Sequence, residues 1–290
     1  MNPNLKSLLE KIISEPIINS SSVSGGCIAD SRKLQFGSGK VFFLKQLHSS
    51  SSGAFDAEEH GLKELRKSGT VNVPEVVCKG SGFLLLQWIE KSLSRTSLSM
   101  EMLGLQFADL HRYRGKKFGF YEDNLLGSSI QSNKPSKQGS LNWAKFFAEN
   151  RLEFQTILAE KNGYTTPEMR NLMDNLIKKV PDLISGTEEG PSLLHGDLWS
   201  GNYLIDKNGI PWLIDPAVYY GHREADLAMT SLFGGFSDSF YSAYKSSYPI
   251  TSGYAEREPL YHLYHLLNHL NLFGKGYYGQ VISILKRYVA

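Results

Sequence analysis

Three oxygen-bearing side chains in the second half of the chain have types and spacing that suit group transfer. A short apolar run precedes both Asp197 and Asp215, and Asn202 lies five residues after Asp197. We therefore expect two strands to deliver these groups to one cleft. Phosphoryl transfer needs such a set, because one carboxylate accepts the substrate hydroxyl proton while a carboxylate and an amide hold Mg²⁺ against the phosphates of ATP.

The spacing of these residues matches a known catalytic pattern. His195, Asp197 and Asn202 form His-x-Asp-x-x-x-x-Asn, which is the spacing of a kinase catalytic loop, and a second Asp follows at the expected distance. An isolated His-Gly-Asp is more often a structural turn, because Asp and Asn are common turn residues. The pattern gains weight only together with elements upstream.

Those upstream elements are a glycine turn and a lysine. Gly25 and Gly26 lie between two predicted strands, where backbone N–H groups can approach phosphates, although they do not complete a glycine-rich motif. Lys45 ends the apolar run 41–44, and Glu58 follows thirteen residues later in a predicted helix. Glu58 is the natural partner to hold the Lys45 ammonium against the α- and β-phosphates. A solvated surface lysine is the usual alternative.

Composition excludes several classes of protein. The 290 residues are 41% hydrophobic and 21% charged, which excludes fibrous and mostly disordered chains. The net charge of +2 is too small to indicate a nucleic-acid binder. Two cysteines, Cys27 and Cys78, are too few for a disulfide-stapled secreted protein. With neither a signal-peptide pattern nor an apolar run of membrane-spanning length, we expect a cytoplasmic protein without a membrane partner.

The elements that position these groups change in character near residues 87–93. Before this point a helix stops at Pro16, three strands with glycine turns cover 20–46, a helix covers 55–67, and two strands cover 73–77 and 83–89. After it, helical patterns dominate, over 100–111, 141–158, 167–180 and 258–273. We predict a small β-rich nucleotide-binding lobe with the hinge, residues 1–89, and a helical catalytic and substrate lobe, residues 90–290.

The chain resembles the fructosamine-3-kinase (ketosamine kinase) family, which shares the protein-kinase-like fold with aminoglycoside and choline kinases. The motifs that carry this resemblance run from one end of the chain to the other: Gly25-Gly26-Cys27-Ile28, Phe42 to Lys45, Asp109-Leu110-His111, Asn124 through Gly127, Trp143 with Phe146-Phe147, Arg151-Leu152, His195 to Asn202, Asp215-Pro216-Ala217, Tyr220 to Glu224, Phe233 to Phe236 and Leu267 to Asn271. The resemblance implies an α+β, bilobal, protein-kinase-like fold. The loop after Gly127 departs from the family pattern, which has a Thr-Pro step there.

The resemblance implies a role for each matching residue. Asp197 is implied as the catalytic base, Asn202 and Asp215 as metal ligands, and Lys45 with Glu58 as the pair that orients the phosphates. The implied ATP site also includes the loop Gly25, Gly26, Cys27 and Ile28, and the backbone of Gln87, Trp88 and Ile89 around adenine.

Substrate contacts are less sharply implied. Trp199 is placed to stack on the sugar or on its amine-bearing part, and His222 and His269 are candidates for the same pocket. Glu224 and Asp226 are candidates to anchor the loop after Asp215 to a neighbouring helix, and Glu224 alternatively meets the cationic amine of the substrate.

The implied reaction transfers the γ-phosphate of ATP, with Mg²⁺, to the sugar 3-hydroxyl of a ketosamine. The 3-phosphate then eliminates and frees the amine, so the outcome is deglycation of a free amine or of a glycated lysine. Two alternatives stay open, a kinase for another amino-alcohol such as an aminoglycoside or choline, and an inactive nucleotide-binding scaffold. A monomer and a redox-linked dimer are both open, since Cys27 in the phosphate loop is a candidate redox switch.

Two further patterns each have a purely structural interpretation beside a functional one. His262, His265 and His269 share a helical face, and a zinc site there weighs less than sugar-pocket lining or plain helix packing. The basic run 111–118, with interleaved aromatics, is more often a solvated helix end than a nucleic-acid site.

Overall fold

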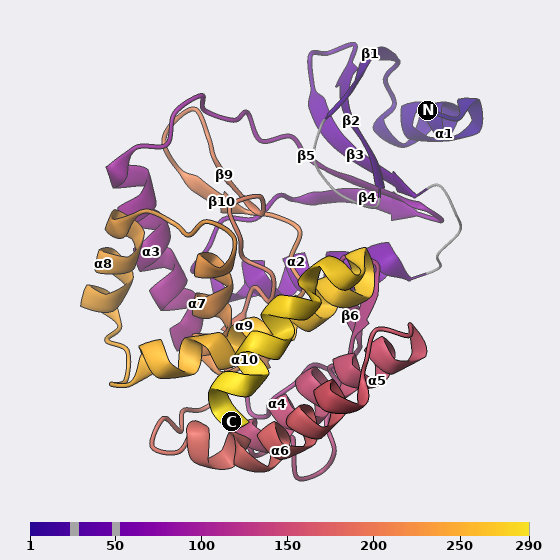
Figure 1. Ribbon diagram of the computed structural model, residues 1–290. Helices are drawn as coiled ribbons and strands as arrows, with labels where there is room; N and C mark the ends of the chain where they lie inside the picture. The colour runs from indigo at the N-terminus through magenta and orange to yellow at the C-terminus, as the bar shows by residue number, and fades with distance from the viewer. Residues whose placement is uncertain (24–28, 48–52, 290) are drawn as a thin grey trace.

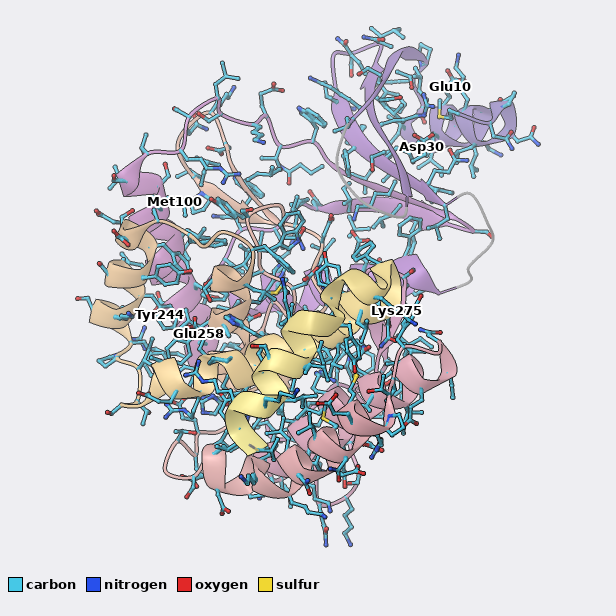
Figure 2. All side chains as sticks on the ribbon, in the orientation of Figure 1. Glu10, Asp30, Met100, Tyr244, Glu258 and Lys275 are labelled. Carbon is cyan, nitrogen blue, oxygen red and sulfur yellow. The ribbon has the colours of Figure 1, made fainter. Side chains whose placement is uncertain are left out.

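The computed structural model describes residues 1–23, 29–47 and 53–289. A twisted antiparallel sheet occupies one end of the molecule, and helices make up most of the remainder (Figure 1). Glu10 and Asp30 lie in the sheet part, whereas Tyr244 and Glu258 lie among the helices, well away from it (Figure 2). The expected α+β architecture, with its strands before its main helices, is confirmed.

The N-terminal sheet has five strands in the order β1-β2-β3-β5-β4, all antiparallel to their neighbours. The strands are β1 Ile17–Ser22, β2 Ala29–Phe36, β3 Val41–Leu47, β4 Val76–Gly80 and β5 Phe83–Gln87. Lys45 lies in the central strand β3, opposite Leu84 of β5. A central strand fixes its backbone on both sides, so the position of the Lys45 side chain is well defined.

The two faces of this sheet pack against different partners. Leu85 and Leu44 face α1 (Pro3–Ile13) in a small core of their own. Leu84 and Leu86 face the opposite side, because successive strand residues alternate. There they share a core with α2 (Ala54–Ser68) and with helices of the C-terminal part. Since α2 belongs to this shared core, Glu58 is held against both parts of the molecule.

The helical part contains most of the remaining elements. Its helices are α3 Ser97–Arg112, α4 Trp143–Phe147, α5 Phe154–Lys161, α6 Pro167–Leu183, α7 Arg223–Leu232, α8 Asp238–Ser247, α9 Tyr254–Phe273 and α10 Tyr278–Val289, with a 3₁₀ turn at Lys275–Tyr277. Three short antiparallel pairs lie between them: β6 Asn124–Leu126 with β7 Ser129–Gln131, β8 Ser192–Leu194 with β11 Tyr219–Gly221, and β9 Tyr203–Ile205 with β10 Pro211–Leu213. None of the described helices is long and apolar enough to cross a bilayer.

Two predicted elements differ from the observed ones. The helix expected over 141–158 is interrupted by a π-helical stretch, Ala148–Glu153, which widens the helix where the buried Arg151 donates to Asn133 and to the carbonyl of Ser132. The strand expected over 73–77 begins only at Val76. Pro74 has no N–H to donate to a ladder, and the carbonyl of Val73 accepts from Arg66 instead (2.9 Å).

The predicted lobe boundary at residue 89 falls in the connection between β5 and α3. Ser92 N–H in this connection donates to the carbonyl of Ile205 (2.8 Å), so the connecting segment is tied to β9 before α3 begins. Because the core shared by α2 and the C-terminal helices crosses this boundary, the division into 1–89 and 90–290 stays a prediction.

Candidate active site

The loop between β8 and β9 carries the predicted catalytic residues. Gly196 has φ = +83°, and a Cβ at this position would lie 2.0 Å from the carbonyl oxygen of Ala217. Only glycine fits there, because any side chain would meet both backbone strain and a backbone clash. The carbonyl of His195 in turn accepts from Ala217 N–H (2.9 Å). The catalytic loop is therefore fixed against the segment that follows Asp215.

A buried carboxylate on α7 holds the start of this loop. Asp226 accepts from the N–H groups of His195 (2.7 Å) and Gly196 (2.9 Å). Its Oδ2 also meets the His111 ring (3.3 Å), whose other nitrogen meets the Tyr244 hydroxyl (2.7 Å). The anchoring role expected for Asp226 has this geometric basis. His111 departs from the solvated helix end expected for the basic run, because it is fully buried.

The His195 ring joins the two acidic segments. Its Nδ1 accepts from the N–H of Asp197 (3.3 Å), so its Nε2 carries the proton and donates to the carbonyl of Ile214 (3.0 Å). Burial lowers the pKa of His195, which keeps the ring neutral and preserves this pattern. His195 is thus a positioning residue between the predicted base and the residue before Asp215.

Asp197 and Asn202 lie face to face across the loop. The side-chain amide of Asn202 donates to the backbone carbonyl (2.8 Å) and to Oδ2 (3.1 Å) of Asp197. These two bonds fix the amide orientation and leave its oxygen turned away from Asp197. Burial, and then the nearby charge of Asp215, raise the pKa of Asp197 well above its usual range, against the opposing hydrogen bond from Asn202.

Lys45, Glu58 and Asp215 form a second group that links the sheet to the helical part. The Lys45 ammonium donates to Glu58 Oε1 (2.6 Å) and to Asp215 Oδ1 (2.5 Å). Burial alone lowers the pKa of Lys45, but the two carboxylates outweigh it and raise the pKa above its ordinary value. Asp215 adopts φ = +54°, a strained conformation for a non-glycine residue. The structure therefore brings together all five residues to which the sequence assigned chemistry.

The predicted adenine segment lies at the end of β5. The N–H of Gln87 donates to the carbonyl of Glu75 (2.8 Å), so this donor is used within the sheet. The Trp88 indole donates to Glu90 (2.7 Å), and Ile89 is buried. Adenine contact by the backbone of this segment stays a prediction. The predicted phosphate loop, Gly25, Gly26, Cys27 and Ile28, lies outside the described residues.

Trp199 is the predicted substrate residue that remains open to solvent, with 38% of its surface exposed. A Cβ on Gly201 would lie 2.4 Å from two atoms of the indole, so the ring lies directly over this glycine. The indole is therefore held on the surface of the catalytic loop between Asp197 and Asn202, where a bound substrate can reach it.

Two other predicted substrate residues are not brought to the site. His222 caps the start of α7, accepting from the N–H of Glu224 (3.2 Å), and its Nε2 meets the carbonyl of Thr187 (2.7 Å). Glu224 forms a two-point ion pair with Arg257 (2.9 and 2.6 Å) and is 1% exposed. Of the two roles open to Glu224, the geometry favours anchoring, because both of its oxygens are already bonded.

His269 lies in an aromatic cluster rather than beside Asp197. Its ring packs on Phe233 (4.7 Å between centroids), Tyr277 (5.1 Å) and Phe273 (5.3 Å), and its Nδ1 meets the carbonyl of His265 (2.8 Å). Among the described residues, no three His, Cys, Asp or Glu side chains are grouped to hold a metal ion. Helix packing accounts for the histidines of α9.

Two arginine contacts were not predicted from the sequence, one at the catalytic loop and one at Glu224. Arg257 pairs with Glu224 from 33 positions away, and Arg95 contacts the catalytic loop from the connection before α3. Neither residue belongs to a local motif. Their partners are distant in sequence, so only the fold shows these contacts.

The fold and the site together define a phosphotransferase of the protein-kinase-like class. The evidence is a sheet lysine paired with a helix glutamate, an Asp–Asn pair on a rigid loop, and a second Asp that meets the lysine.

Within this class the chain belongs to the fructosamine kinase family, whose model matches residues 1–290. A probable ketoamine kinase of Synechocystis sp. is 41% identical over 271 residues, which cover 92% of this chain and 88% of that protein. A chloroplastic protein-ribulosamine 3-kinase of Arabidopsis thaliana is 38% identical over 275 residues, covering 92% and 82%.

Solved structures agree with this assignment. A protein from Thermobifida fusca assigned as a fructosamine-3-kinase superposes with a TM-score of 0.89 at 28% identity, over 99% of both chains. An ADP-bound aminoglycoside phosphotransferase gives a TM-score of 0.69 at 15% identity, over 100% of this chain and 98% of the other. The second likeness shows the fold alone. The family and the protein-kinase-like fold predicted from the motifs are confirmed.

Proposed function

We propose that the paired groups around Asp197 and Lys45 transfer the γ-phosphoryl group of ATP to the 3-hydroxyl of a ketosamine. The observation that carries this proposal is the convergence of Lys45, Glu58, Asp197, Asn202 and Asp215 from four separate elements into two bonded groups. Membership of the fructosamine kinase family and similarity to named ketoamine and ribulosamine kinases support the ketosamine as acceptor.

In this reaction Asp197 orients the acceptor and receives its proton. The bond between the 3-oxygen and the γ-phosphorus forms while the bond from phosphorus to the departing ADP oxygen breaks, and the hydroxyl proton passes to a carboxylate oxygen of Asp197. The raised pKa of Asp197 suits a group that must hold this proton. Asn202 keeps the carboxylate in one orientation through its bond to Oδ2. Elimination of the 3-phosphate then releases inorganic phosphate and leaves an imine, and hydrolysis of this imine by water frees the amine.

The residues present fit a hard divalent cation such as Mg²⁺. Asp215 offers Oδ2, since its bond to Lys45 uses Oδ1, and Asn202 offers its amide oxygen, since its bonds to Asp197 use the nitrogen. Carboxylate and amide oxygens with few protein ligands are what Mg²⁺ accepts beside phosphates. Asn202 and Asp215 would hold the ion, which supplies positive charge against the phosphates when bound.

The alternatives are a kinase that acts on an aminoglycoside or on choline, and an inactive nucleotide-binding scaffold. An aminoglycoside or choline acceptor would use the same Asp197 and the same fold, so only substrate turnover separates them. An inactive nucleotide-binding scaffold has no chemical need for a base held by its own amide partner, which Asn202 provides. Ketosamine phosphorylation is therefore the function that the site supports best.

Turnover against a panel of acceptors tests the proposal. ATP consumption with Mg²⁺ would be measured for a ribulosamine, a fructosamine, an aminoglycoside and choline, with the Asp197→Asn variant alongside. We expect ketosamine-dependent turnover that is lost in the variant. Turnover on the aminoglycoside or choline alone would contradict the acceptor, and ATP binding without turnover on any of the four would favour the scaffold.

Several finer points belong to the same proposal. A glycated protein lysine, as well as a free ketosamine, is within the chemistry of the site, because only the sugar meets Asp197.

The two cysteines support a reducing compartment such as the cytoplasm. Cys78 is half-buried and burial raises its pKa, which disfavours the reactive thiolate. A dimer linked through Cys27 remains a prediction, and denaturing electrophoresis without reductant would test it.

A further inference from the structure

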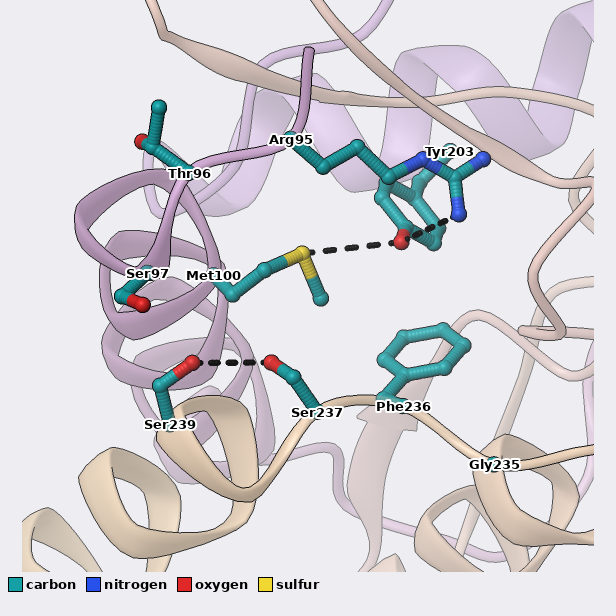
Figure 3. A pocket seen from close by; sticks show the side chains of 9 residues that line it. All are labelled: Arg95, Thr96, Ser97, Met100, Tyr203, Gly235, Phe236, Ser237 and Ser239. Carbon is teal, nitrogen blue, oxygen red and sulfur yellow. Dashed lines mark hydrogen bonds between the residues drawn. The ribbon is translucent and has the colours of Figure 1, made fainter.

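A pocket of about 220 Å³ lies beside the catalytic loop, on the side formed by the C-terminal part of the chain (Figure 3). Its apolar lining residues are Met100, Tyr203 and Phe236, and its polar lining residues are Arg95, Thr96, Ser97, Ser237 and Ser239. We call this cavity the Arg95 pocket. Its wall includes the glycine loop between α7 and α8, where Gly234 and Gly235 both have positive φ (+92° and +72°).

Arg95 brings a positive charge that nothing in the pocket balances. The guanidinium lies over the Tyr203 ring (4.6 Å to its centroid) and donates through Nη1 to the Tyr203 hydroxyl (2.8 Å). Its Nη2 donates to the carbonyl of Ser200 (3.2 Å). No acidic side chain lines the pocket, and the hydrogen-bond partners of Arg95 among the described residues are the Tyr203 hydroxyl and the Ser200 carbonyl. Because a guanidinium has five N–H donors, several remain for an anionic group.

The pocket lies close to the proposed catalytic base, Asp197. Ser200, whose carbonyl Arg95 contacts, is three residues from Asp197, so their Cα atoms are at most about 11 Å apart. Tyr203 directly follows Asn202 and is the first residue of β9. All of the lining residues lie in the segments 95–100, 203 and 235–239, none of them in the five-stranded sheet. The pocket therefore lies beside the catalytic loop and outside the five-stranded sheet that carries Lys45.

We infer that the Arg95 pocket binds an anionic group on the amine-bearing part of the acceptor. This inference rests on the proposed function and adds the acceptor class, a ketosamine with a carboxylate several bonds from its sugar. Nine bonds separate the sugar C3 from the α-carboxylate of an ε-glycated lysine, a span of about 11 Å when extended. An extended ε-glycated lysine can therefore reach from Asp197 to the Ser200 end of the loop, and its aliphatic stem suits Met100 and Phe236.

Two sources supply such a carboxylate. One is the α-carboxylate of a free glycated lysine, and the other is an acidic side chain next to a glycated lysine in a peptide. Both present the same group to Arg95, so the substrates must separate them. The alternative role for Arg95 is purely structural, as a support for the Ser200 carbonyl in the catalytic loop. A structural role would change the turnover of every acceptor equally.

The first experiment compares two substrates that differ in one charge. With ATP and Mg²⁺, kcat/KM would be measured for the ε-ribulosamine of Nα-acetyl-lysine and for that of its C-terminal amide. We expect kcat/KM to be about tenfold higher for the substrate with the free carboxylate than for the amide, which is the effect of one charge-assisted hydrogen-bonded pair. Arg95→Gln should reduce this preference to about one. An equal loss for both substrates would overturn the inference in favour of the structural role.

Two further variants sharpen the test. Arg112→Gln is the matched control, because Arg112 also lies over a tyrosine (Tyr248, 4.8 Å) but at the other end of α3, and it should keep the preference. Ser237→Asp puts a negative charge in the pocket without touching the catalytic loop, and Asp serves as an N-cap as well as Ser does. Its expected effect is to reverse the preference toward the amide. An unchanged preference in Ser237→Asp would contradict the inference.

A peptide arm identifies the source of the carboxylate. Ribulosamine peptides with Glu or Gln beside the glycated lysine would be compared, each amidated at its C-terminus. A preference for the Glu peptide that depends on Arg95 indicates a protein or peptide acceptor. A preference for the carboxylate that is confined to the single glycated lysine indicates a metabolite acceptor. If the wild-type enzyme turns over no ketosamine, the proposed function fails. If it turns over acid and amide equally, only the pocket assignment fails.

Discussion

The catalytic loop and the Arg95 pocket are neighbours, yet they hold their polar groups in opposite ways. At the catalytic loop, the Asp226 carboxylate of α7 accepts from two backbone N–H groups and meets a histidine ring, and all of these groups are buried. In the pocket, Arg95 is exposed and lacks an acidic partner among the described residues. The loop is therefore set before a substrate arrives, whereas the pocket has donors to offer.

This difference fits a division between chemistry and recognition. Stabilising a transition state needs groups that do not reorganise during the reaction, which buried and fully bonded groups provide. Recognising an acceptor needs unsatisfied donors and an accessible surface, which Arg95 and Trp199 provide. Changes at Asp197 and Asp226 should therefore lower turnover of every acceptor, and changes at Arg95 or Trp199 should alter how acceptors are bound.

The largest effect is expected for Asp197→Asn. The amide cannot accept the hydroxyl proton, so kcat should fall by about 10²–10⁴-fold for every ketosamine. The KM for ATP should change little, because Lys45 and Glu58 are untouched. Steady-state kinetics with a ribulosamine would measure both parameters. A variant with near-normal kcat would show that the base lies elsewhere.

Asp226→Asn is expected to have the next largest effect. The substitution removes one of two acceptors for the N–H groups of the catalytic loop, and it removes the charge that His111 meets. We expect a loss of about 1–3 kcal/mol in the free energy of unfolding and a lower kcat for all acceptors alike. Asp109→Asn, an exposed acid on α3, is the control and should change neither. Selective loss of one acceptor would contradict the positioning role.

Acid should weaken the buried region through its neutral histidines. Burial, with His269 and His262 nearby, lowers the pKa of His265 to about 3, against about 6.5 in the unfolded chain. The unfolded state therefore binds one more proton between these values, and stability falls as pH decreases from about 6.5 to about 3. The slope from this group is about 1.4 kcal/mol per pH unit.

His265→Met tests this pH dependence. Nδ1 of His265 has no hydrogen-bond partner among the residues that the structure describes, so replacing the ring removes a buried titrating group without breaking a bond at that atom. Urea unfolding at pH 7, 6 and 5 should show a shallower loss of stability in the variant, by about one proton. Parallel curves for the two proteins would show that His265 does not carry the acid sensitivity.

Gly201→Ala is expected to give the smallest change, and on the recognition side only. The added Cβ would meet the Trp199 ring at 2.4 Å and push it from its place over the loop. We expect KM for the ketosamine to rise by about 2- to 12-fold, the equivalent of about 0.5–1.5 kcal/mol for one aromatic contact. KM for ATP should stay constant, and a fall in kcat instead would place Trp199 in the chemical step.

The sequence was informative where function and fold depend on local spacing. The apolar runs before Asp197 and Asp215 predict two strands, and the structure places β8 and β10 there. The helix expected over 55–67 is α2, Ala54–Ser68, since its apolar positions recur at helical spacing and Gly69 ends it with φ = +68°. Local periodicity and capping were sufficient in these places.

The remaining features depend on contacts that are distant in sequence. Helix α8, Asp238–Ser247, is rich in Ser and Tyr, which are poor helix formers, and it is stabilised by packing Phe240 and Tyr244 into the core that includes α3. The ion pair between Glu224 and Arg257 is equally invisible to spacing. For the same reason the Arg95 pocket, built from three separate segments, could not be predicted.

The position and fate of the transferred phosphate test the central claim most directly. Phosphorus NMR of the wild-type reaction with ATP, Mg²⁺ and a ribulosamine would follow the product in time. We expect the phosphomonoester signal to be a doublet, because carbon 3 of the sugar bears one hydrogen. This signal should decay as inorganic phosphate and free amine appear. A stable product with a triplet, from phosphate on a primary hydroxyl, would contradict it.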